Sequence, residues 1–113
     1  DQSVEGGEKA LRDLLTRHPD VTAVFTFNDI IAIGALRAAR RLGRRIPEDL
    51  AVIGFDGLPL GALVEPPLTT VALDTRELGA LAVEQAARLL TSSGGLSRDE
   101  LVVHARLRLR ESA

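Results

Sequence analysis

Two kinds of apolar pattern divide most of this 113-residue chain into predicted strands and helices. Short continuous apolar runs are typical of buried strands. They predict strands over residues 21–27, 50–55 and 68–73. Apolar residues spaced three or four apart predict helices over residues 4–17, 30–42 and 74–90, with one or two helical turns within 58–64.

The last segment shows a third pattern, a strict alternation from Leu101 to Leu109. This predicts a final strand with one solvent-exposed face, near a sheet edge. The resulting order, α-β-α-β-(short α)-β-α-β, predicts an α/β fold with a mainly parallel sheet flanked by helices in a three-layer α/β/α arrangement. A chain of this length forms one compact domain or part of a larger one.

The second predicted helix carries apolar residues on more than one face, which favours burial on two sides. Gly34 lies inside it, where glycine costs about 1 kcal/mol relative to alanine. A close approach of another backbone would explain that glycine.

Composition removes several classes of function. There is no cysteine, which excludes disulfides and thiolate metal sites, and the net charge of −2 gives no reason to expect direct nucleic-acid binding. No apolar run reaches the roughly 18 residues of a membrane span. Residues 1–20 contain no apolar signal core, so we expect a cytoplasmic protein. The only aromatic residues, Phe25, Phe27 and Phe55, are expected in the core rather than in a sugar-stacking platform.

Polar side chains follow two of the predicted strands where each strand ends. Asn28 and Asp29 follow the first strand, and Asp56 follows the second. In open α/β sheets, ligands bind outside the carboxyl ends of the strands. A carboxylate accepts hydroxyls, and an amide both donates and accepts, so Asn28 and Asp56 together suit a sugar, a nucleoside or another polyol.

Structural roles compete with ligand binding at these positions. Asn28 suits a helix N-cap, and we expect Asp29 to be a structural cap or turn residue. Asp74 is expected to cap the helix that begins near residue 75, with Glu77 completing a capping box.

The sequence shows few of the patterns that are typical of enzymes. No serine lies on a strand-to-helix turn, and no phosphate-binding glycine loop is present. Asp29 and Asp56 as a Mg²⁺ pair for phosphoryl transfer remain an alternative, although the acidic cluster is missing and Lys9 is the only lysine. We therefore predict a protein that is not an enzyme and has no catalytic residue, no metal site and no cofactor.

Five motifs, in order, resemble the LacI/GalR family of bacterial transcriptional regulators over essentially the whole chain. They are FNDIIAIGAL (27–36), LG (42–43), IPEDLAVIGFD (46–56), PPLTTV (66–71) and LRES (109–112). The resemblance implies a periplasmic-binding-protein-like (type I) effector domain, built of two hinged α/β subdomains around a small ligand. This chain would supply part of it: residues 1–73 the C-terminal subdomain, 74–100 a crossover helix and linker, and 101–113 a closing strand.

The resemblance also implies roles for individual residues. The family's effector contacts map to Asn28 and Asp56, and the effector would be a sugar or nucleoside. Two departures bear on the effector's identity: Gly57 stands where many members carry a second acid, and Leu73 stands where some carry a polar residue. Operator DNA would be bound only by an N-terminal helix-turn-helix outside this chain.

Family members dimerise through the helix after Asn-Asp and the segment after Gly-Phe-Asp. The implied interface residues of a homodimer are Ile33, Leu36, Arg37, Arg40, Leu58, Leu60 and Leu63. A periplasmic sugar-binding protein of a transport system is the alternative, and it differs in being usually monomeric.

Overall fold

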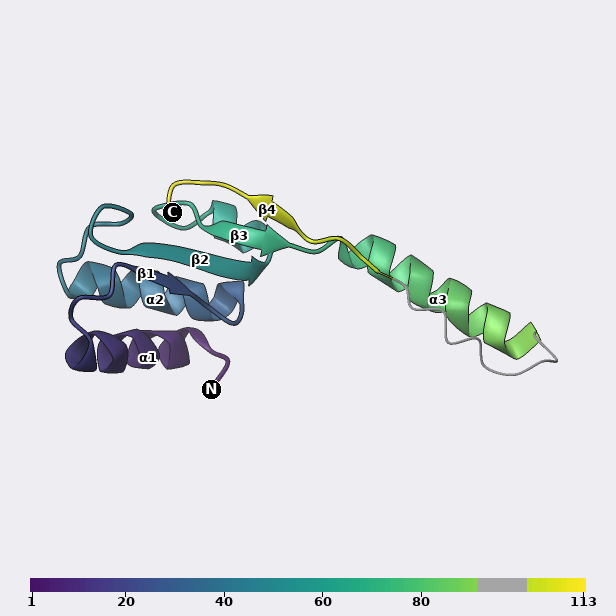
Figure 1. The fold of residues 1–113 in the computed structure, drawn as a ribbon, viewed down its shortest axis with the longest axis horizontal. Coiled ribbons are helices and arrows are strands. Elements are labelled where there is room, and N and C mark those ends of the chain that lie inside the picture. Colours follow the sequence, from purple (N-terminus) through teal and green to yellow (C-terminus); the bar gives the residue numbers. More distant parts are fainter. Residues whose placement is uncertain (92–101) are drawn as a thin grey trace. The chain divides into compact units, whose positions relative to one another are not determined.

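The computed structural model describes residues 1–91 and 102–113. Its elements follow the predicted order (Figure 1). They are α1 (Val4–Arg17), β1 (Ala23–Phe25), α2 (Asp29–Arg41), β2 (Ala51–Asp56), the 3₁₀ helix η1 (Pro59–Ala62), β3 (Thr69–Ala72), α3 (Thr75–Thr91) and β4 (Arg106–Arg108).

The four strands form one sheet in the order β1-β2-β3-β4. The pairs β1–β2 and β2–β3 are parallel, whereas β3–β4 is antiparallel. The predicted mainly parallel sheet is therefore confirmed, and β4 lies at a sheet edge as expected. Because β1 and β2 run in the same direction, their carboxyl ends lie at one edge, where α2 begins (Figure 1).

Two strands are shorter than their sequence patterns predict. Strand β1 covers three residues of the predicted 21–27, and β4 covers three of the predicted 101–109. Residue 101 lies outside the described residues, and 102–105 form no strand. Each of the two strands pairs over three residues only: β1 with Ala51–Ile53 and β4 with Thr70–Ala72. The alternating pattern predicts which face of a strand each side chain would occupy, but it does not predict how many residues pair with a neighbouring strand.

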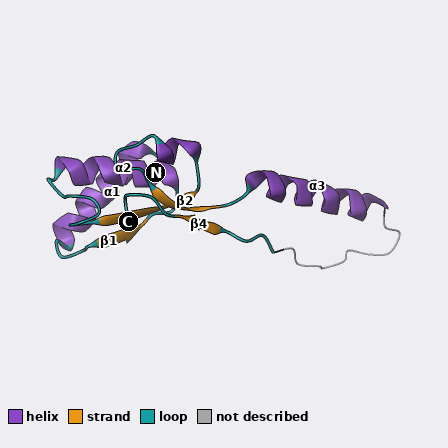
Figure 2. Ribbon diagram, turned by 90° about the horizontal axis from the view of Figure 1, so that it is seen from above, coloured by secondary structure: helices purple, strands orange, loops and turns teal. Residues whose placement is uncertain are grey.

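Helix α1 packs on α2, and α2 packs on β2 (Figures 1 and 2). The approach of the two helices is close: a Cβ added at Gly34 would lie 2.1 Å from the Val4 carbonyl oxygen and 2.9 Å from Gly7 Cα. The close backbone approach predicted for Gly34 is thus confirmed, and α1 is the neighbour that requires it.

An apolar core fills the space between these helices and the sheet. Leu11 and Leu15 of α1 contribute from one side, and Leu50, Val52 and Leu68 are fully buried beneath α2. This packing explains why α2 is apolar on more than one face, since it contacts the sheet on one side and α1 on another.

The chain divides into two compact units, residues 1–72 with 106–113 and residues 73–105. The second contains α3, in which no residue is buried. Its start is fixed locally, because Asp74 Oδ1 accepts from the backbone N–H groups of Arg76 and Glu77 at 3.1 and 3.0 Å. Among the described residues, no helix is both long and apolar enough to cross a membrane.

Candidate ligand site at the carboxyl ends of the strands

Asn28 and Asp56 lie at the carboxyl edge of the sheet, one before α2 and one at the end of β2. Both are half-buried. Asn28 Oδ1 accepts from the Ile31 N–H at 2.9 Å and so caps α2. Its Nδ2 group donates no hydrogen bond to the described residues. The cap and a ligand contact are therefore compatible, because they use different atoms of one amide.

Asp56 has an unusual backbone for a non-glycine residue, with φ at 111°. Such strained conformations persist only where the surroundings enforce them, and they cluster at functional sites. Within the described part of the chain, the Asp56 carboxylate has no hydrogen-bond or ion-pair partner. It is thus a half-buried acceptor that is free to bind donors from a ligand.

Asp29 has a different role from the helix cap that we expected, because Asn28 occupies the N-cap position. The Asp29 side chain is 0% exposed. Its Oδ2 accepts from the Leu58 N–H at 2.6 Å, and its Oδ1 accepts from the Thr70 hydroxyl at 2.5 Å. Asp29 therefore joins three elements instead of capping one.

This arrangement also weakens the Mg²⁺ alternative. The carboxylate of Asp29 is enclosed and hydrogen-bonded at both oxygens, so it is not presented to an ion beside Asp56. Across residues 1–91 and 102–113 there is no group of three or more histidine, cysteine, aspartate or glutamate residues that could hold a metal.

Thr70 is the residue of this region that the sequence patterns do not single out. It lies in an apolar run that predicts a strand, and strands tolerate threonine well. The useful signal is the pair Thr69-Thr70, because two hydroxyls in a buried strand each require a partner.

The phenylalanines do not lie in the core, so that prediction is wrong. Phe25 is 64% and Phe27 is 70% exposed, while Phe55 is half-buried. Phe25 and Phe55 contact edge to face, with their ring centroids 6.4 Å apart. Alternation explains the difference: Val24 points toward the core, so its neighbour Phe25 points to the opposite face of the sheet.

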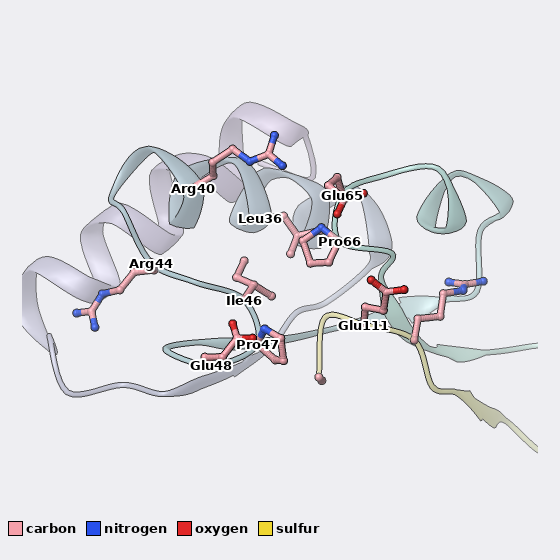
Figure 3. A pocket seen from close by; sticks show the side chains of 11 residues that line it. Leu36, Arg40, Arg44, Ile46, Pro47, Glu48, Glu65, Pro66 and Glu111 are labelled. Carbon is pink, nitrogen blue, oxygen red and sulfur yellow. The ribbon is translucent and has the colours of Figure 1, made fainter.

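A hollow of about 600 Å³ lies at the other end of the strands, where β2 and β3 begin (Figure 3). Leu36, Ile46 and Pro66 line it together with charged side chains, and it contains neither Asn28 nor Asp56. This hollow therefore lies away from the polar groups that follow β1 and end β2.

The loop beside that hollow contains an ion pair between Arg45 and Asp49. Arg45 Nε and its backbone N–H both donate to Asp49 Oδ2 at 2.9 Å, and Nη2 donates to Oδ1 at 2.6 Å. These hydrogen bonds from Arg45 hold the pKa of Asp49 well below its ordinary value of 3.8. The ion pair stabilises the connection from α2 to β2.

The expected dimer residues fall into two groups. Ile33 and Leu36 are buried by their own chain, at 8% and 5% exposure, so little of their surface is available to the implied interface. Leu60 and Leu63 are 45% and 81% exposed. The remaining members are Arg37 and Arg40, which are exposed, and Leu58, which is half-buried.

Comparison with known proteins agrees with this architecture. The whole chain, residues 1–113, matches the family model of the periplasmic binding protein-like domain. It is 40% identical to the HTH-type transcriptional regulator CelR of Thermobifida fusca, over 99% of this chain and 33% of that protein. It is 45% identical to the HTH-type transcriptional regulator MalR of Streptomyces coelicolor, over 82% of this chain and 26% of that protein.

Solved structures show the same likeness. A LacI family transcriptional regulator from Arthrobacter sp. FB24, in complex with lactose, superposes with a TM-score of 0.88 at 43% identity, over 99% of this chain and 42% of that one. A complex of the transcriptional regulator CelR with cellobiose gives a TM-score of 0.82 at 38% identity, over 100% of this chain and 34% of that one.

The chain therefore belongs to the periplasmic binding protein-like domain family. Within that family it is an effector-domain fragment of the LacI/GalR type, since the relatives named above are regulators of that kind. It spans a third or less of the length of those two curated relatives.

Proposed function

We propose that this chain is the effector-sensing part of a LacI-type transcriptional regulator that responds to a sugar or a related small polar molecule. The observation that carries the proposal is the pair of open polar groups at one rim. The Asp56 carboxylate and the Asn28 Nδ2 group have no partner among the described residues, although both side chains are half-buried. Solved structures of relatives in complex with lactose and with cellobiose support a carbohydrate ligand.

The chemistry of the rim suits a neutral polyol. A carboxylate accepts from two hydroxyls, and an amide N–H donates to a hydroxyl oxygen, so hydroxyls removed from water keep their hydrogen bonds. Two polar groups at one rim contact only part of a ligand, whereas binding pockets cover most of a ligand's surface. We therefore propose that this chain supplies one wall of a cleft. By itself, the chain should bind sugars with a dissociation constant no lower than millimolar.

In the intact protein, the effector would act by favouring one placement of the two walls. Operator affinity would change only as far as the effector binds one state more tightly than the other. The regulator would work in the cytoplasm as a homodimer. We propose that the dimer surface is centred on Arg37, Arg40, Leu60 and Leu63, the members of the expected interface that are exposed in this chain.

Calorimetry on the full-length protein, with lactose, cellobiose and ribose as probes, tests this proposal. Asp56→Asn is the informative variant, because asparagine tolerates a positive φ while the carboxylate charge is removed. We expect about a tenfold loss of affinity, equivalent to about 1.4 kcal/mol. Asp49→Asn is the matched control, since Asp49 lies beyond the opposite strand ends and should leave binding unchanged.

Two results would contradict the proposal. One is a wild-type protein that binds none of the three sugars, and the other is an Asp56→Asn variant that binds as tightly as the wild type. A full-length protein that binds sugar, is monomeric and does not bind DNA would instead fit a transport receptor.

A further inference from the structure

A buried polar cluster lies directly beneath the rim and joins α2, β3 and the turn after β2. The Thr70 hydroxyl donates to Asp29 Oδ1 at 2.5 Å and accepts from the Gly57 N–H at 3.3 Å. The Leu58 N–H donates to Asp29 Oδ2 at 2.6 Å. One carboxylate and one hydroxyl thus hold two successive amides of the turn.

The cluster is shielded from water, because Asp29 and Thr70 are both 0% exposed. The hydrogen bonds that satisfy the Asp29 carboxylate come from a hydroxyl and an amide. Opening the cluster would leave a buried carboxylate without donors, which is costly in a low-dielectric interior. The turn is therefore held in one geometry.

Space for the carboxylate is provided by a glycine of β2. A Cβ added at Gly54 would lie 2.2 Å from Asp29 Oδ1, so a larger residue there would displace the carboxylate. The cluster thus depends on the glycine of the Ile-Gly-Phe-Asp run, two residues before Asp56.

The cluster lies next to both proposed effector contacts. Asn28 directly precedes Asp29, and Asp56 directly precedes the two clamped amides. Asp56 keeps a strained φ of 111°, which requires a surrounding structure that enforces it. The clamped turn supplies that constraint.

We propose that Asp29 and Thr70 are positioning residues of the effector site, which clamp the Asp56–Leu58 turn to the start of α2 and fix the Asp56 carboxylate relative to the Asn28 amide. This inference rests on the proposed function. According to this inference, Asp29 and Thr70 contribute to effector affinity without contacting the ligand, and they also contribute to the stability of the fold.

The adjacent threonine offers a matched control. Thr69 is also fully buried in β3, but its Oγ1 accepts from the backbone N–H of Arg110 at 2.9 Å, away from the turn. Thr69→Val and Thr70→Val thus remove the same group from the same strand at equal burial. They differ in whether the lost hydroxyl holds the Asp56 turn.

The test measures sugar affinity by calorimetry and the melting temperature for each variant of the full-length protein, with the sugar that the wild type binds among lactose, cellobiose and ribose. We expect both valine variants to lower the melting temperature. Thr70→Val should weaken binding about tenfold, or about 1.4 kcal/mol, whereas Thr69→Val and the conservative Thr70→Ser should stay within about twofold.

Equal affinities of the two valine variants would overturn the inference while leaving the proposed function intact. A wild-type protein that binds none of the three sugars would remove the proposed function and this inference with it. If Thr70→Val does not fold, Asp29→Asn replaces it, because it keeps the side-chain shape and removes one acceptor; affinity within twofold of wild type would then overturn the inference. Hydrogen exchange of the wild type adds a measurement without a variant: fast exchange of the Leu58 amide contradicts the clamp.

Discussion

Two regions of the unit formed by residues 1–72 and 106–113 each contain a buried carboxylate, but the two carboxylates have different partners. At the contact between α1 and α2, Glu8 meets two arginines of α2: Arg37 at 2.9 Å and Arg41 at 2.5 Å. At the rim, Asp29 meets a hydroxyl and a backbone amide. Both carboxylates are almost inaccessible to water.

The partners differ in their access to water. The side chains of Arg37 and Arg41 are 49% and 58% exposed, so they can be solvated if Glu8 is removed. Thr70 is fully buried, so its hydroxyl has no such alternative if Asp29 is removed. The comparison indicates that Asp29 with its uncharged partners contributes more to stability than the two ion pairs of Glu8.

The largest expected effect comes from removing the rim carboxylate. Asp29→Ala leaves the buried Thr70 hydroxyl and the half-buried Leu58 N–H without their acceptor. We expect a loss of about 3 kcal/mol in the free energy of unfolding. Equilibrium urea denaturation of the chain measures it, and a loss no larger than that of Glu8→Ala would contradict the comparison.

The next largest effect tests what holds α1 to α2 apart from the ion pairs. Gly34→Ala places a methyl group against the backbone of α1, where neither helix can yield without separating. Overpacking of this kind should destabilise the chain by about 2 kcal/mol, even though alanine has a higher helix propensity than glycine. Gly79→Ala in α3 is the matched control, because its Cβ would meet nothing within 4 Å; it should be neutral or stabilising in the same denaturation experiment.

A smaller effect is expected from the ionic partner of the comparison. Glu8→Ala removes both ion pairs but leaves two half-exposed arginines that water can solvate. We expect a loss of about 1 kcal/mol, reduced further by added salt. A loss above that of Asp29→Ala, measured at the same ionic strength, would show that charge and not access to water decides the cost.

The smallest effect concerns a carboxylate with an exposed partner, Asp49 beside Arg45. Since the folded state lowers the pKa of Asp49, this group stabilises the fold above its ordinary value of 3.8, and the stabilisation is lost as the pH falls below that value. Asp49→Asn should therefore lower stability slightly at neutral pH and flatten its decline in acid. Thermal melts of both proteins from neutral to acid pH check this, and parallel curves would contradict it.

Much of the fold follows from local patterns in the sequence. The order of elements, the cap at Asn28 and the close approach at Gly34 were all predictable, because each depends on neighbours a few residues away or on one conspicuous glycine. The lengths of β1 and β4 were not, because the number of paired residues depends on how the fold aligns each strand with its neighbour: β1 pairs only with Ala51–Ile53, although β2 continues to Asp56. The exposure of Phe25 was not either, since it depends on which face of the sheet is covered.

The candidate site divides in the same way. The sequence by itself determined that Asn28 follows one strand and Asp56 ends another, and parallel pairing then places them at one edge of the sheet. Only the tertiary structure decided that Asp29 turns inward to Thr70 and Leu58, and that Asp56 keeps its strained backbone. The reason is physical: a strand end is a local property of the chain, whereas a buried carboxylate is satisfied by whichever donors the fold brings to it, here from residues 29 and 41 positions away in the sequence.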